Sequence, residues 1–322
     1  RGRMIVVTGG AGFIGSNIVK SLNLKGEQEI IIVDDLSNGK KVKNISDLDI
    51  YDYIDYLDFK ELIKKNRFKD VSAIIHQGAD STTTNWDGRH MMNVNYEYSK
   101  SILHFCLNNT IKFIYASSAS VYGTGKKFLE IRENEKPINM YAYSKFLFDQ
   151  YVRNQVFSKD LNNNSVVGLR YFNVYGPREE HKESMASTIY HFYNQIIQTG
   201  VAKLFSGNDG YDDGEQKRDF VYVKDVADVN MWFLQNNESG IFNLGTGKTC
   251  TFKKVAETVI DWLKDHDVNG EIKFIDFPKN LIGSYQSYTE ADLTLLRKSG
   301  YRKNFLSIEE GISDYLSIMH KV

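Results

Sequence analysis

The chain has 322 residues, 42% hydrophobic and 25% charged, a composition that suits one large α/β domain or two interleaved ones. The net charge is −1 without a basic block, and no apolar run reaches membrane-spanning length, so we expect neither a nucleic-acid nor a membrane partner. The two cysteines lack metal-ligand spacing and the seven histidines are scattered, which predicts no disulfide scaffold, no metal site and a cytoplasmic setting.

Apolar runs alternate with helical segments in the first half of the chain, a pattern typical of α/β proteins with a parallel sheet. We therefore expect a Rossmann-type doubly wound parallel sheet. The expected strands are residues 4–8, 29–33, 71–76, 112–116 and 165–172, and the expected helices are 14–24, 95–107 and 141–156.

The second half of the chain has a different texture, with a loop rich in Gly and Asp at 206–215. Its expected elements are helices at 185–199 and 224–235, a return to the sheet near 242–245, and two or three helices and a strand after 252. We expect an NADP-binding Rossmann domain at 4–172 plus about 224–250. A smaller α/β substrate-binding lobe is expected at about 173–223 plus 251–322.

A glycine-rich turn, Gly9-x-x-Gly12-x-x-Gly15, lies between the first expected strand and its helix. Glycines let the backbone turn tightly and approach a pyrophosphate, which the helix N-terminus then attracts. Asp34 follows the second strand, where an acid that contacts the ribose is expected. The combination predicts dinucleotide binding.

The residues after the second strand point to two different cofactors. Asp34 and Asp35 favour the free ribose hydroxyls of NAD. Lys40, Lys41 and Lys43 can pair with the 2′-phosphate of NADP, or they form a solvated loop. The sequence leaves the choice open.

Tyr141 and Lys145 lie four residues apart on an expected helix and therefore share a face. Lowering a tyrosine pKa from ~10 to about 7 takes ~4 kcal/mol, which an ammonium at ~4 Å supplies at an effective dielectric of ~20. With an oxidised nicotinamide nearby, the tyrosine becomes a usable base. Ser118, at a strand end, can donate to the oxygen from which Tyr141 takes a proton.

These motifs resemble the extended short-chain dehydrogenase/reductase superfamily, which acts on nucleotide sugars, over essentially all of residues 4–320. Within it, the chain is most similar to the ADP-L-glycero-D-manno-heptose 6-epimerases. The runs that carry this resemblance are 8–17 (TGGAGFIGSN), 86–88 (WDG), 171–187 (YFNVYGPREEHKESMAS) and 217–223 (KRDFVYV). Many relatives share the first run, whereas HKESMAS is more specific.

The resemblance implies an epimerase that inverts C6 of ADP-heptose for the lipopolysaccharide core, with tightly bound NADP that takes up and returns the hydride. Tyr141 and Lys182 correspond to its two bases, one for each epimer, and Lys145 to its ribose-binding lysine. The other cofactor contacts correspond to Gly9, Gly12, Phe13, Ile14, Gly15, Asp34, Asp35, Lys41, Gln77, Gly78, Ala79, Asn95 and Val174. The substrate contacts correspond to Ser81, Asn173, Ser184, His191, Phe205, Ser206, Gly207, Asn208, Arg218 and Tyr285. A homo-oligomer, with a pentamer known in the family, is also implied.

Several features depart from the family pattern. Asp35 stands where asparagine is common near the 2′-phosphate, which favours NAD, whereas Lys41 favours NADP. Gln77 replaces an acid, and the segment 210–215 looks longer than in relatives. Without the resemblance, Lys182 reads as a loop charge, and His191 and Tyr285 as packing residues.

Other functions remain as alternatives. One is another NAD(P)-dependent nucleotide-sugar epimerase or reductase of the superfamily, and another is a non-catalytic NAD(P)-sensing regulator. A regulator of this kind typically lacks Tyr141 or Lys145, and both are present. A 4,6-dehydratase is disfavoured because Ala119 and Ser120, rather than a carboxylate pair, follow Ser118.

Overall fold

The computed structural model describes residues 3–159 and 164–322, which fall into two compact units. The first unit draws on Arg1–Val121, Pro137–Arg170 and Val226–Phe242. The second unit comprises Tyr122–Lys136, Tyr171–Asp225 and Asn243–Val322. The chain therefore passes between the units several times.

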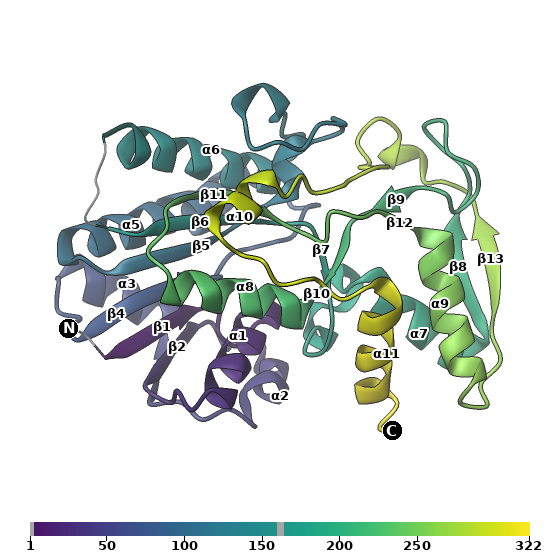
Figure 1. Cartoon of the computed structure of the whole chain (residues 1–322), viewed down its shortest axis with the longest axis horizontal. Coiled ribbons are helices and arrows are strands. Elements are labelled where there is room, and N and C mark those ends of the chain that lie inside the picture. The colour runs from purple at the N-terminus through teal and green to yellow at the C-terminus, as the bar shows by residue number, and fades with distance from the viewer. Residues whose placement is uncertain (1–2, 160–163) are drawn as a thin grey trace. The chain divides into compact units, whose positions relative to one another are not determined.

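A parallel seven-stranded sheet forms the first unit (Figure 1), which confirms the expected fold class. Its strand order is β11-β6-β5-β4-β1-β2-β3. Strands β1, β2 and β4 are mostly apolar and β5 is apolar at residues 113–116, as expected for a parallel sheet whose two faces are covered by helices. The bounds are β1 Met4–Thr8, β2 Ile30–Asp34, β3 Asp52–Asp55, β4 Val71–His76, β5 Lys112–Ser118, β6 Val166–Tyr171 and β11 Gly240–Leu244.

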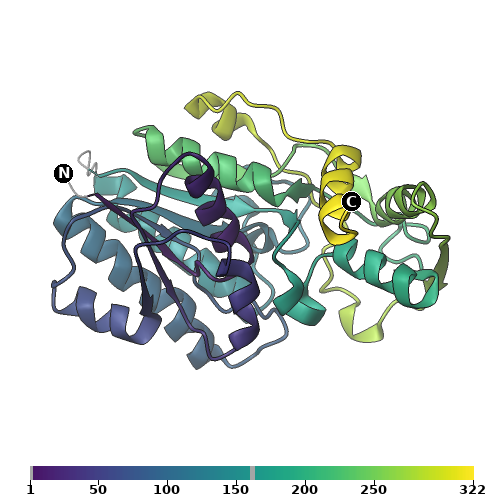
Figure 2. The ribbon, with the colours of Figure 1, turned by 90° about the horizontal axis from the view of Figure 1, so that it is seen from below.

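The helices lie on opposite faces of this sheet (Figure 2). On one face lie α1 (Phe13–Leu24) and α8 (Val223–Gln235), and on the other α3 (Tyr56–Lys64) and α5 (Tyr98–Asn109). The helix α6 (Met140–Gln155) shares a buried core with α3 and α5, to which Phe59, Ile102 and Phe148 contribute. Short helical segments are α2 Val42–Ile45, α4 Gly88–Met91, a π-helical turn at Met92–Glu97, and 3₁₀ turns at Gly39–Lys41, Ala119–Tyr122, Arg132–Asn134 and Phe157–Lys159.

The second unit contains three two-stranded sheets and four helices. The pairs are β7 (Asn173–Tyr175) with β10 (Phe220–Tyr222), β8 (Val201–Phe205) with β13 (Glu271–Ile275), and β9 (Lys217–Arg218) with β12 (Cys250–Thr251). The helices are α7 Thr188–Thr199, α9 Phe252–Lys264, α10 Thr294–Ser299 and α11 Ile308–Met319, with 3₁₀ turns at Glu180–Met185 and Lys279–Leu281. Its core joins α7, α9 and α11 through residues such as Phe192, Val259 and Ile312.

Most expected elements are present, and the differences have local causes. Strand β3 and helix α3 were not predicted, because their polar residues interrupt the apolar periodicity that marks a buried strand or an amphipathic helix. The helix α7 begins at Thr188 rather than at 185 because the Ser187 side chain caps it. Residues 122–136, placed by the expected boundary in the first domain, belong to the second unit, where Tyr122 Oη donates to Asn243 Oδ1 at 2.6 Å.

The helices of residues 3–159 and 164–322 are all too short or too polar to cross a membrane.

Candidate active site

A glycine turn joins β1 to α1 and leaves no room for side chains. Gly9 has φ +66, and a Cβ there would lie 2.7 Å from the Gly78 amide nitrogen. A Cβ on Gly15 would lie 2.1 Å from the Gly9 carbonyl oxygen. The helix then begins at Phe13, and Gly12 at its N-cap makes no side-chain capping hydrogen bond. A helix N-terminus bordered by bare backbone fits the pyrophosphate of a dinucleotide.

The buried carboxylate of Asp34 lies at the end of β2, beside the glycine turn. One oxygen accepts a hydrogen bond from Ala11 N at 2.8 Å, and the other accepts one from Lys41 Nζ at 3.0 Å. Asp35 is exposed, and hydrogen bonds from Ser37 hold the pKa of its carboxyl below the usual value. Asp34 is thus placed for ribose hydroxyls, and Lys41 is held beside it instead of extending into solvent.

The three serines at the end of β5 have different partners. The Ser117 hydroxyl donates to the buried Asp149 carboxylate at 2.7 Å. Ser118 Oγ accepts hydrogen bonds from Ser120 N at 3.1 Å and from Ser120 Oγ at 2.9 Å. Ser118 also makes a hydrogen bond with Tyr141. The structure therefore brings Ser118, rather than its neighbours, to the tyrosine.

Tyr141 lies in the first turn of α6, which the Asn139 side chain caps. The helix dipole at that end favours a developing phenolate. Lys145 follows one turn later, is buried, and donates through Nζ to Ala116 O at 2.8 Å. The expected helix therefore carries both residues and directs the lysine toward β5.

In the protein without its cofactor, the pKa of Tyr141 lies above the usual value of a tyrosine. Burial raises it, the hydrogen bond with Ser118 lowers it in part, and the charge of Asp80 raises it further. Burial lowers the pKa of Lys145 to about 8, and the charge of Asp149 opposes this. Burial thus dominates at both residues in the protein alone, and the expected lowering of the Tyr141 pKa by Lys145 together with an oxidised nicotinamide stays a prediction.

The loop after β4 approaches the glycine turn. Gln77 N donates to Thr8 O at 3.0 Å, and Gly78 N donates to Thr8 Oγ1 at 3.1 Å. Beyond them, Ala79 and Ser81 are exposed. The first two residues are thus fixed against β1, whereas the next ones are accessible to a ligand.

Asn95 ties this loop to α6. Its side chain bonds to the backbone N and O of Asp80, each at 2.9 Å, and donates to Ser144 Oγ at 3.1 Å. The Asp80 carboxylate pairs with His90 Nε2 at 2.8 Å. Asn95 lies in the π-helical turn, a feature frequent at functional sites. The turn directs its amide toward the residue before Lys145.

In the second unit, Lys182 lies on a strained turn. Its 3₁₀ segment contains Glu183 with φ 51 and ψ −117, and Arg178 has φ 76. Positive φ values at such residues are uncommon and often mark functional sites. Burial lowers the pKa of Lys182, and the charge of Glu179 opposes this in part. The expected second base thus has a property that a base requires.

Glu179 holds this turn in place. Its buried carboxylate accepts hydrogen bonds from Gly176 N at 3.3 Å, Ser187 N at 2.5 Å, Ser187 Oγ at 2.7 Å and Tyr315 Oη at 2.8 Å. Burial raises its pKa, and the hydrogen bonds oppose this. Sequence reasoning missed Glu179, because nothing in the local pattern shows that it is buried.

Two further expected substrate residues meet beside the turn. His191 Nε2 and the carbonyl oxygen of Ser184 lie 3.2 Å apart. Asn173 and Val174 lie on β7, where Asn173 N donates to Asp219 O at 3.0 Å. His191 is therefore held by the turn and is not a core residue, and its role as a substrate contact stays a prediction.

Arg218 lies among aromatic rings. Its guanidinium carbon is 4.7 Å from the Tyr285 ring centre, and its Nε donates to Gln286 O at 3.0 Å. Phe205 packs against Tyr285 at 6.2 Å and against Phe277 at 5.5 Å between ring centres. The rings meet edge to face, and a cation beside such a group of rings suits a nucleoside diphosphate. Sequence reasoning missed Phe277, although it found the other aromatic residues.

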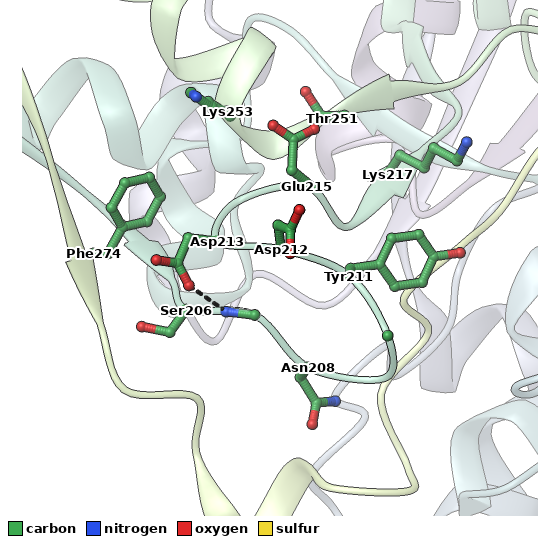
Figure 3. A pocket seen from close by; sticks show the side chains of 12 residues that line it. Ser206, Asn208, Tyr211, Asp212, Asp213, Glu215, Lys217, Thr251, Lys253 and Phe274 are labelled. Atoms are coloured by element: carbon green, nitrogen blue, oxygen red, sulfur yellow. Dashed lines mark hydrogen bonds between the residues drawn. The ribbon is translucent and has the colours of Figure 1, made fainter.

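The loop 206–215 borders a cavity of about 1100 Å³ (Figure 3). Ser206, Gly207 and Asn208 line one side, and Gly207 N donates to Asp213 Oδ1 at 2.7 Å. The expected ADP-binding stretch is thus the wall of an open, polar cavity.

Across the described ranges, no group of three His, Cys, Asp or Glu side chains could hold a metal ion.

Asp219 supports the strand that carries Arg218. Its buried carboxylate accepts hydrogen bonds from Thr246 N and Oγ1 at 2.8 Å, Gly247 N at 2.9 Å and Ala291 N at 3.0 Å. Burial raises its pKa, and these donors oppose the rise. Asp219 lies next to Arg218, a candidate substrate contact. Its carboxylate joins its own segment to the segments of Thr246 and Ala291.

Comparisons with known proteins match the chain to one family and to several solved structures. A model of the NAD dependent epimerase/dehydratase family matches residues 5–245. The ADP-L-glycero-D-manno-heptose-6-epimerase of Helicobacter pylori is 30% identical, with 100% of this chain and 97% of that chain covered and a TM-score of 0.83. A UDP-N-acetylglucosamine 4-epimerase from Methanobrevibacter ruminantium is 27% identical, with both chains fully (100%) covered and a TM-score of 0.83. The Thermus thermophilus UDP-glucose 4-epimerase, in complex with NAD, is 26% identical, with 98% and 99% covered and a TM-score of 0.79.

The glycine turn generates a first prediction. Gly15→Ala should lower dinucleotide affinity at least about tenfold, because its Cβ would lie 2.1 Å from the Gly9 carbonyl oxygen and must displace the start of α1. Gly39→Ala is the control, since a Cβ there meets nothing within 4 Å. Calorimetric titration with NADP and NAD measures both. Equal affinities for the two variants would contradict the placement of the pyrophosphate at this turn.

Proposed function

Because the chain belongs to the NAD dependent epimerase/dehydratase family, we propose that it is a nucleotide-sugar epimerase that inverts C6 of ADP-heptose. It converts ADP-D-glycero-D-manno-heptose to ADP-L-glycero-D-manno-heptose with bound NADP. The observation that carries the proposal is Lys182, a lysine with a lowered pKa on a strained turn, in addition to the Tyr141 and Lys145 pair. The similarity to the Helicobacter pylori heptose epimerase over the whole chain supports it.

Inversion of an alcohol carbon requires two bases if the sugar keeps one position in the site. Oxidation removes the hydroxyl proton together with the hydrogen on carbon, and reduction from the other face leaves the hydroxyl pointing the opposite way. One base cannot reach both hydroxyl positions while the sugar stays in place. We assign Tyr141 and Lys182 to the two epimers.

The first unit prepares Tyr141. Ser118 donates a hydrogen bond to it or to the sugar oxygen, and the N-terminus of α6 favours its anion. Lys145 would hold the ribose hydroxyls of the cofactor. When bound, the cofactor would supply the hydride acceptor and, in its oxidised form, a positive charge that offsets the burial of the phenolate.

The second unit supplies the other base and the nucleotide contacts. Burial favours the neutral amine of Lys182, which can then accept a proton. Arg218 is suited to the diphosphate, because a guanidinium binds phosphate oxygens bidentately. Phe205 and Tyr285 offer aromatic faces for the adenine ring of the nucleotide, next to the cavity lined by Ser206 and Asn208.

A second candidate is 4-epimerisation of a UDP-sugar. Neighbours at 27% and 26% identity act on such substrates, and their reaction inverts a ring carbon. In that case one tyrosine serves both faces while the whole sugar swings, and Lys182 is dispensable.

The two-base assignment predicts opposite defects. Tyr141→Phe and Lys182→Met should each lower epimerisation at least about 100-fold, since general-base loss typically costs about 10²–10⁴. Each variant should still oxidise one epimer in a single turnover, and the two should select opposite epimers. Nicotinamide absorbance with each purified ADP-heptose epimer gives the single-turnover result, and product analysis gives epimerisation.

Matched controls separate this effect from a loss of fold. Tyr143→Phe alters an exposed tyrosine on α6, and Lys203→Met alters an exposed lysine on β8. Both should retain wild-type turnover. Near wild-type turnover of Lys182→Met would refute its role as a base. Turnover of UDP-glucose or UDP-N-acetylglucosamine, without turnover of ADP-heptose, would favour the second candidate.

The route through transient oxidation also predicts the origin of the hydrogen at C6. The hydrogen removed from that carbon is the one returned, and it does not exchange with water. Epimerisation in heavy water should therefore give a product without deuterium at C6, as measured by NMR and mass spectrometry. Stoichiometric deuterium at C6 would show deprotonation at carbon and would remove the roles of Tyr141 and Lys182.

We propose NADP as the resident cofactor because Lys41 lies beside Asp34, at the ribose end of the site. Lys41→Gln should weaken NADP binding by about 10-fold or more, the scale of a charge-assisted hydrogen bond of ~1.5–3 kcal/mol, and NAD binding much less. Lys25→Gln, an exposed lysine at the far end of α1, is the control. Mass spectrometry of the cofactor released from purified protein decides directly, and NAD alone would overturn the choice.

A further inference from the structure

The carboxylate of Asp149 is completely buried in the first unit, one helical turn beyond Lys145 on α6. Its Oδ1 accepts a hydrogen bond from Tyr115 Oη at 2.9 Å. Its Oδ2 accepts bonds from Ser117 Oγ at 2.7 Å and from Arg170 Nε at 3.0 Å, and lies 2.9 Å from Arg170 Nη2. Arg170 is equally buried, on β6. The proposed function uses neither residue.

The position of these bonds along β5 links them to Lys145. Tyr115 and Ser117 flank Ala116, whose carbonyl oxygen accepts the bond from Lys145 Nζ at 2.8 Å. Asp149 therefore binds β5 on both sides of the Ala116 carbonyl, which accepts the hydrogen bond from the Lys145 ammonium. Movement of this carboxylate would move the ammonium and the strand end that leads to Ser118.

The charge of Asp149 acts on the same lysine. Burial lowers the pKa of Lys145 to about 8, and Asp149 is the charge that opposes this fall. Burial and the Lys145 charge lower the pKa of His76, on β4, to about 3, so this neighbour is neutral. Burial raises the pKa of Tyr115 on β5 and of Tyr141 on α6, so both are neutral as well. Asp149 is therefore the charge that acts on Lys145, and Arg170 pairs with Asp149.

We propose that Asp149 is the positioning residue of Lys145: it fixes the strand carbonyl that holds the ammonium and keeps the ammonium protonated at the pH of catalysis. The proposal rests on the proposed role of Lys145 as the ribose-binding lysine. A pair made only for stability would not need its charge, because a buried ion pair can often be replaced by apolar residues without loss of stability.

The test measures protonation of Lys145 directly. In protein labelled with ¹³C at the lysine Cε, the Lys145 signal, assigned with Lys145→Arg, should titrate near 8 in the wild type. Asp149→Asn should increase the proton dissociation constant at least about tenfold, which is one pKa unit. Arg170→Gln retains the Asp149 carboxylate, so the pKa of Lys145 in this variant should stay at or above the wild-type value.

A double variant covers the case in which a single change leaves a buried charge and prevents folding. Asp149→Asn with Arg170→Gln has neither charge, so the pair is neutral and the side chains are close in size. Its Lys145 pKa should also fall, because the carboxylate is the charge that acts on the lysine. An unchanged or raised pKa in the double variant overturns the proposal. Arg153→Gln, roughly two turns along α6, should leave the Lys145 signal unchanged.

Cofactor binding separates this inference from the proposed function. Dinucleotide affinity should decline as pH rises through the Lys145 pKa, and in Asp149→Asn or the double variant this decline should begin at least one unit lower. If the Lys145 pKa shifts but the pH dependence of dinucleotide affinity does not, Asp149 controls the charge of Lys145 and the ribose-binding role of Lys145 is wrong. If affinity follows pH but the pKa is the same in the double variant, the role stands and Asp149 does not control it.

Discussion

A buried carboxylate must be surrounded by donors, because taking an unpaired charge out of water costs several kcal/mol. Among the buried carboxylates of residues 3–159 and 164–322, three such groups lie close in sequence to a proposed functional side chain. Asp149 is four residues from Lys145, Glu179 is three from Lys182, and Asp219 is next to Arg218. Each collects its donors from segments far apart in the chain. The need to satisfy a buried charge therefore fixes irregular backbone that no regular hydrogen-bond ladder could hold.

The three carboxylates restrict different degrees of freedom. Asp149 joins a helix to two neighbouring strands of one sheet, so it sets the depth of the lysine on that helix. Glu179 bonds to the beginning of α7 and to α11, and it thereby stabilises a turn with unfavourable backbone angles beside Lys182. Asp219 binds backbone amides after β11 and near residue 291, so the strand that carries Arg218 cannot slide. The positions of the proposed functional side chains thus depend on buried charges whose hydrogen-bond partners come from distant segments.

The sequence predicts what depends on local pattern. The glycine turn, the buried strands and the helix with Tyr141 and Lys145 follow from periodicity and spacing, and the structure contains them. The carboxylates could not be predicted in this way, since Asp149 is a single acid directly after the apolar residues 146–148 of α6 and its burial depends on Arg170, 21 residues later. Phe277 was missed for the same reason, because its contact with Phe205 is made only in the folded unit. Lys182 was found only through resemblance, and its strained turn is a property of the fold.

The order in which Tyr141 and Lys145 titrate constrains how the first unit can work. Base catalysis requires Tyr141 to lose its proton while Lys145 keeps its own. In the protein alone the order is reversed, because burial raises the tyrosine pKa above its usual value and lowers the lysine pKa to about 8. A positive charge beside the phenol restores the order by favouring the phenolate, and the oxidised nicotinamide provides one. Tyr141 would then gain basicity only when the site is ready to accept hydride and would lose it once the ring is reduced and neutral. Lys145 cannot provide this switching, because its charge stays the same throughout the reaction. The pair therefore divides the work: the tyrosine responds to the redox state, and the lysine, held charged by Asp149, maintains a constant field.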